Sequence, residues 1–193
     1  MPRQTFAQLV SLACHDLRTP LATASGFART LERLEEIKEP AKRYVEMIGA
    51  ATDQLAELLD LLSAVARIEA GKFEPQLRSA NTRELADAAA GRTEDGRVVV
   101  EGKGGEVRAD ADWAAVSLSA VAEAARRHGG LEQVTLRVTG TVVSIAPIVD
   151  NAGPIALGDD LRDFGAAVGV QVLAACGAEV ELGDDALNVR FNA

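Results

Sequence analysis

The chain has little of several features that mark particular protein classes. It has two cysteines in 193 residues, and Cys14 and Cys176 lie far apart without metal-ligand spacing, which favours two small apolar residues in a reducing cytosol over a disulfide. It has 20 basic and 29 acidic residues, and the resulting net charge of −9 argues against a nucleic-acid partner. No apolar run approaches the roughly 18 to 20 residues of a membrane span, and no signal-peptide apolar region follows Met1. We therefore expect a cytoplasmic protein without a membrane span.

The first third of the chain has the apolar spacing of two long helices. From residue 4 to about 36, apolar residues including Leu17, Phe27 and Leu31 recur mostly every three or four positions, which predicts a helix with one buried stripe. A break at 37–40 and a second periodic segment over 40–69 predict an antiparallel hairpin.

Two such helices bury too little apolar surface by themselves. We therefore expect two hairpins to pair as a homodimer, in a dimeric four-helix bundle. The expected interface residues are Leu55, Leu58, Leu59 and Leu62. The alternative is that the apolar stripe packs against the C-terminal part of the same chain.

One short segment of the first helix carries reactive side chains. His15 and Thr19 are four positions apart and share a helix face, and Asp16 stands beside the imidazole. An adjacent carboxylate can hold one imidazole nitrogen protonated while the other attacks phosphorus. Pro20 removes the helical hydrogen bond to the Asp16 carbonyl, which predicts a bend just after the histidine. The simpler alternative is a surface histidine on a coiled-coil helix beside a chance proline.

The heptapeptide His15-Asp16-Leu17-Arg18-Thr19-Pro20-Leu21 resembles the H box of sensor histidine kinases, written H-E/D-x-R/K-T-P-L. Residues 66–72 are similar to the end of that family's dimerisation and phosphotransfer hairpin. The resemblance implies that residues 1–72 form such a hairpin and that His15 is the phosphoacceptor. It also implies that Asp16 orients and deprotonates the imidazole, that Thr19 positions water or the receiver, and that Arg18 offers a charge to a receiver domain.

Residues 73–193 have the pattern of a small domain that mixes helices and strands. After a linker over 72–80, helices are predicted at 81–90, 112–127 and 164–176. Strand signals lie at 98–100, 106–108, 134–138, 142–148, 179–182 and 187–191. This order predicts an α+β fold, a two-layer sandwich with mostly antiparallel strands. The order also resembles the catalytic and ATP-binding domain of histidine kinases.

Compared position by position, this resemblance implies a degenerate nucleotide pocket. Asp150 stands where the family's aspartate accepts a hydrogen bond from adenine, but Ala120 and Ala124 stand where asparagines hold Mg²⁺ and phosphate. Pro154 removes a backbone donor, and Asp163 puts a carboxylate where polyphosphate would lie. We therefore expect no cofactor in this chain, with ATP not bound productively and Mg²⁺ supplied by the partner receiver.

Three functions remain open. The leading hypothesis is histidine phosphotransfer in a two-component phosphorelay, in which His15 exchanges a phosphoryl group with the receiver aspartates of response regulators. The alternatives are a minimal ATP-dependent sensor histidine kinase, with Asn151 or another residue supplying the metal ligand, and a non-catalytic module that binds a receiver or a kinase. His128, the only other histidine, is expected to cap a helix or face solvent.

Overall fold

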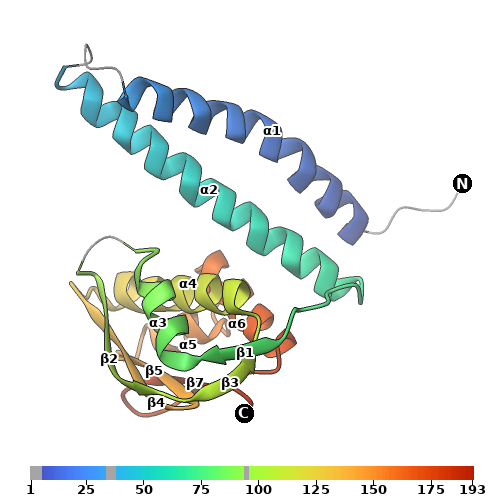
Figure 1. The fold of residues 1–193 in the computed structure, drawn as a ribbon, viewed down its shortest axis with the longest axis vertical. Helices are drawn as coiled ribbons and strands as arrows, with labels where there is room; N and C mark the ends of the chain where they lie inside the picture. The colour runs from blue at the N-terminus through green and yellow to red at the C-terminus, as the bar shows by residue number, and fades with distance from the viewer. Residues whose placement is uncertain (1–5, 34–37, 94–95) are drawn as a thin grey trace, which may run out of the picture. The chain divides into compact units, whose positions relative to one another are not determined.

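The computed structural model describes residues 6–33, 38–93 and 96–193. The chain divides into two compact units, residues 1–72 and residues 73–193. The first unit is a helical hairpin and the second combines helices with two sheets (Figure 1). The predicted fold class, a helical hairpin followed by a small α+β domain, is confirmed. No described helix is both long enough and apolar enough to cross a membrane.

The hairpin consists of helix α1 (Phe6–Glu32) and helix α2 (Ala41–Glu69), which run antiparallel (Figure 1). Its buried residues are mostly small or medium-sized, with Leu61 the largest: Cys14, Ala28, Val45, Gly49, Thr52, Leu61, Ala64 and Ala66. A Cβ atom at Gly49 would lie only 3.0 Å from Oε1 of Glu32. The Glu32 side chain on α1 therefore reaches across to α2 at Gly49.

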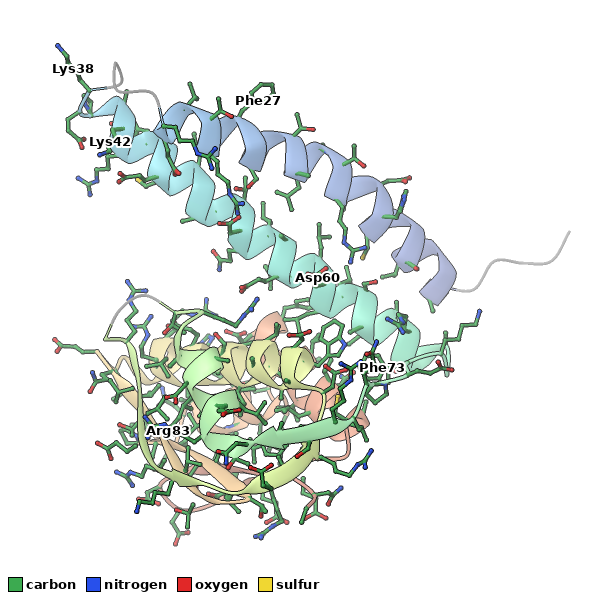
Figure 2. All side chains as sticks on the ribbon, viewed as in Figure 1. Phe27, Lys38, Lys42, Asp60, Phe73 and Arg83 are labelled. Atoms are coloured by element: carbon green, nitrogen blue, oxygen red, sulfur yellow. The ribbon has the colours of Figure 1, made fainter. Side chains whose placement is uncertain are left out.

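Much of the predicted apolar stripe of α1 is exposed in the single chain. Leu17 is 53% exposed, Phe27 67% and Leu31 40%, and Phe27 projects away from α2 (Figure 2). The predicted burial of this stripe depends on pairing of two hairpins, so it stays a prediction. Within one hairpin, α2 covers one face of α1, and the smaller residues Cys14 and Ala28 are the ones buried. The predicted helix end near residue 36 lies outside the described residues.

Helix α1 continues past its internal proline, and a turn at a glycine ends α2. Helix α1 runs through Pro20, and the hydroxyl of Thr23 donates to the Thr19 carbonyl at 3.0 Å. At the end of α2, Gly71 has φ +64°, a conformation that side chains other than glycine rarely adopt. This turn brings the Lys72 N–H to the Arg67 carbonyl at 2.8 Å.

The second unit contains four helices and seven strands among its described residues. The helices are α3 (Thr82–Ala90), α4 (Ala111–Gly129), α5 (Gly153–Leu157) and α6 (Phe164–Ala175). The strands are β1 (Arg78–Asn81), β2 (Val98–Gly104), β3 (Glu106–Ala109), β4 (Val134–Gly140), β5 (Val142–Ala146), β6 (Glu179–Leu182) and β7 (Leu187–Arg190).

The larger sheet has the strand order β2-β4-β5-β7-β6. Strands β2 and β4 are parallel, whereas the other neighbours in this sheet are antiparallel. Helices lie over one face of the sheet (Figure 1). Between these layers lies a core of fully buried side chains that includes Leu118, Leu136, Ile145, Leu173 and Leu187.

Two elements of this unit differ from the sequence-based prediction. The last residues of the predicted linker form β1, which pairs antiparallel with β3 in a separate two-stranded sheet. The residues of β3 that pair with β1 lie about thirty positions later in the chain. The four residues of β1 therefore show no strand pattern of their own. The short helix α5 was not predicted either, because its five residues include Gly153 and Pro154.

Candidate functional site

His15 lies on an open surface of α1. Its side chain is 79% exposed and that of the neighbouring Asp16 is 68% exposed. Nδ1 of His15 lies 3.1 Å from Oδ1 of Asp16. A neutral imidazole that donates from Nδ1 to this carboxylate carries its lone pair on Nε2. The geometry therefore favours Nε2 as the nucleophilic atom and leaves it open to an incoming group.

Arg18 and Thr19 are adjacent on α1, but only the Arg18 side chain reaches across to α2. Nη2 of Arg18 donates to Oδ1 of Asp60 on α2 at 2.8 Å, and Thr19 is exposed. Sequence reasoning missed Asp60, which lies 42 positions after Arg18 and belongs to no motif. The hairpin thus brings a third charged side chain, beside those of Asp16 and Arg18, to the segment that contains His15.

Cys14, beside His15 in sequence, is fully buried. Burial is the largest cause that raises the pKa of its thiol, and the charge of Arg18 acts in the opposite direction. A buried neutral thiol is a poor nucleophile. Cys14 therefore acts as a small core residue rather than as a second reactive group.

A second charged cluster lies in the other unit, at the first turn of α6. The Asp163 side chain is only 5% exposed and caps the helix by accepting from the Ala166 N–H at 3.0 Å. Its other oxygen accepts from Arg127 Nη2 at 2.8 Å and lies 3.0 Å from His128 Nε2. The prediction that His128 caps a helix or faces solvent is wrong. Packing of α4 against α6 brings the two helix ends together, and no sequence pattern indicates that contact.

The residues compared with the nucleotide pocket of the family lie on α4, in the turn before α5 and at the start of α6. Ala120 and Ala124 are apolar positions of α4, and Asp163 already supplies an anion to the first turn of α6. Asp150 is exposed in the turn before α5. Glu123, the nearest other carboxylate on α4, pairs with Arg126 at 3.0 Å. Within residues 6–33, 38–93 and 96–193, no group of three or more His, Cys, Asp or Glu side chains is placed to hold a metal ion.

Comparison with known proteins identifies the first unit. Residues 7–71 match the family described as the His Kinase A (phospho-acceptor) domain. The hairpin is a histidine kinase-type phosphoacceptor domain. The chain is 34% identical over 71 residues to the sensor protein DivL of Caulobacter vibrioides, a match that covers 37% of this chain and 9% of DivL. It is also 29% identical over 65 residues to the probable sensor histidine kinase TcrY of Mycobacterium tuberculosis, which is 34% of this chain and 14% of TcrY.

Solved structures share the fold beyond the phosphoacceptor domain. Full-length ShkA in complex with AMPPNP superposes with a TM-score of 0.60 at 20% identity, covering 98% of this chain and 47% of ShkA. The histidine kinase AdeS of Acinetobacter baumannii gives a TM-score of 0.56 at 14% identity, covering 92% of this chain and 97% of AdeS. Residues 73–193 thus have the fold that follows the phosphoacceptor domain in histidine kinases.

Proposed function

We propose that this chain is a histidine phosphotransferase in a two-component phosphorelay. The observation that carries the proposal is the exposed His15 with Nδ1 held by Asp16, on a domain whose family is named for phosphate acceptance. The partners are receiver domains of response regulators, and the reaction takes place in the cytoplasm. The matches span only 9% of DivL and 14% of TcrY. The proposal therefore concerns this chain and is not taken from the activity of those longer proteins.

The proposed reaction needs one nucleophilic nitrogen and one leaving carboxylate. Nε2 of His15 attacks the phosphorus of an aspartyl phosphate on the receiver, the N–P bond forms, and the P–O bond to the aspartate breaks. The aspartate leaves as a carboxylate, while Asp16 stabilises the positive charge that develops on the imidazole. The reverse sequence delivers the phosphoryl group to a second receiver.

Neighbouring side chains have assigned roles in this proposal. Thr19 is exposed one helical turn after His15, where it can orient water or contact the receiver. Arg18 supplies a positive charge on the same helix. In this proposal the receiver domain supplies Mg²⁺.

We further propose that two hairpins pair as a homodimer. Leu55 is 52% exposed in the single chain, and Leu58, Leu59 and Leu62 are only partly buried. Apolar side chains of this size are strong candidates for a helix bundle interface. Leu17, Phe27 and Leu31 on α1 are exposed in the same way.

For residues 73–193 we propose a fold that has lost productive ATP binding. Support comes from Ala120 and Ala124, which cannot ligate Mg²⁺, and from the buried Asp163, whose negative charge opposes a phosphate chain. Asp150 is retained as the residue of a vestigial adenine pocket. The second candidate, a minimal ATP-dependent histidine kinase, is favoured by the shared fold with ShkA, whose structure is described with AMPPNP.

One experiment separates these functions. The full chain is incubated with a receiver domain phosphorylated on its aspartate and, separately, with labelled ATP and Mg²⁺. We expect acid-labile label on the protein from the receiver and none from ATP. His15→Gln should abolish labelling, and His128→Gln, the matched control, should retain it. Label from ATP would establish the kinase candidate, and no label from either donor would leave only a non-catalytic role.

A further inference from the structure

Two ion pairs of the same kind join α1 to α2. Arg18 Nη2 donates to Asp60 Oδ1 at 2.8 Å, and Arg29 Nη2 donates to Asp53 Oδ1 at 3.0 Å. The side chains are similarly exposed, 45% and 55% in the first pair and 61% and 58% in the second. The two pairs therefore make comparable structural contributions to the hairpin, and exposed pairs of this kind contribute little to stability.

The pairs differ in what lies beside them. Arg18 is three positions after His15, and residues at this spacing are neighbours on a helix surface. Arg29 is fourteen positions after His15, and its partner Asp53 also lies 3.5 Å from the hydroxyl of Ser25. Only the Arg18–Asp60 pair is therefore close enough along the helix to affect a group bound on the imidazole.

We propose that Asp60 is a positioning residue that acts through Arg18 to limit how strongly His15 holds a phosphoryl group. In the free protein Asp60 pairs with the Arg18 guanidinium and offsets its charge. A phosphoryl group on Nε2 brings negative charge that competes with Asp60 for this guanidinium. This inference rests on the proposed function, and it assigns to Asp60 a role that the H box does not indicate.

The electrostatic terms have one sign. Replacing Asp60 with asparagine removes a negative charge and leaves the full positive charge of Arg18 for the phosphoryl group. The interaction energy of an exposed ion pair corresponds to a change of about two- to fivefold in the ratio of phosphorylated to unphosphorylated His15. Asp60 thus keeps phosphohistidine at an energy from which the group is readily passed on, as a carrier between two receivers requires.

The test uses phosphoramidate, a chemical donor that needs no partner protein. Nε2 attacks its phosphorus, the phosphorus–nitrogen bond of the donor breaks, and ammonia leaves. At one fixed donor concentration, the ratio of phosphorylated to unphosphorylated full-length chain is measured by intact mass. We expect Asp60→Asn to raise this ratio about two- to fivefold and Asp53→Asn, the matched control, to leave it unchanged.

A double substitution shows whether Asp60 acts through Arg18. Arg18→Gln should lower the ratio, and Asp60→Asn should have little further effect in that background because the two side chains form one unit. An unchanged ratio in Asp60→Asn, or an equal rise in Asp53→Asn, would overturn the inference. An equal effect of Asp60→Asn with and without Arg18 would also overturn it.

The outcomes for the proposed function are separate. If wild type acquires no acid-labile phosphoryl group on His15 from phosphoramidate or from a phosphorylated receiver, phosphotransfer itself fails. If His15 is phosphorylated and Asp60→Asn behaves like wild type, only the role of Asp60 fails. Thermal unfolding of both asparagine variants checks that the hairpins are equally stable.

Discussion

The Asp163 carboxylate contacts the Ala166 N–H, the Arg127 guanidinium and the His128 imidazole. Replacing Asp163 with alanine removes all three contacts. Loss of a helix N-cap costs about 0.5–2 kcal/mol. Loss of hydrogen bonds to charged partners costs about 1.5–3 kcal/mol, and the lower end applies because the Arg127 side chain is 50% exposed. We therefore expect Asp163→Ala to lower the free energy of unfolding of this unit by about 2–4 kcal/mol.

Asparagine at the same position separates the cap from the charge. Asn can still accept from the Ala166 N–H, but it no longer carries the negative charge that faces Arg127 and His128. We expect Asp163→Asn to cost about 1–2 kcal/mol. For a unit of this size, each kcal/mol corresponds to a fall of about 4 °C in Tm.

The assay is urea unfolding followed by the fluorescence of Trp113. This residue is the only tryptophan and lies on α4, where its ring contacts Phe73 edge-on with centroids 5.9 Å apart. Its signal therefore reports on the second unit. Asp159→Ala, an exposed acidic position, is the control and should change stability by less than about 0.5 kcal/mol. If Asp163→Ala unfolds at the same urea concentration as this control, the cluster does not stabilise the unit.

Three further predictions concern other sites. Leu55→Lys should raise the dissociation constant of the proposed homodimer at least about tenfold, because each dimer loses two apolar side chains from its interface. A dissociation constant by sedimentation equilibrium that equals the wild-type value would contradict this. Pro20→Ala should stabilise α1 by about 1–3 kcal/mol by restoring a helical hydrogen bond, seen as a higher midpoint in far-ultraviolet circular dichroism. Burial, with a smaller contribution from Asp110, raises the pKa of the Cys176 thiol from 9.0 to about 12. The folded protein therefore keeps this proton where the unfolded chain loses it, so stability should fall as pH rises from about 9 toward 12, and Cys176→Ala should remove that part of the pH dependence in urea unfolding.

Patterns that act over a few residues were read correctly from the sequence. The spacing of apolar residues predicted both long helices, and α3 begins where Asn81 caps it by accepting from the Arg83 N–H at 2.9 Å. The H box located the family of the first unit, since residues 7–71 match its phosphoacceptor domain. These signals are local because helix periodicity, capping and a contiguous motif all lie within a few turns.

Contacts between distant residues were not predicted. The pairing of β1 with β3 and the contact between Asp60 and Arg18 join segments that share no pattern. Likewise, periodicity indicated that Leu17 and Phe27 are apolar positions of one helix, but it did not show that smaller residues occupy the face toward α2.

The sequence by itself determined the order of the helices and strands apart from β1 and α5, the α+β class and the position of the H box histidine, because each depends on residues close together in the chain. Tertiary structure decided which charges meet. The packing of α4 against α6 gives Asp163 its partners Arg127 and His128, and the antiparallel hairpin gives Arg18 its partner Asp60. The physical reason is that an ion pair depends on the distance between two side chains, which the fold sets and sequence separation does not.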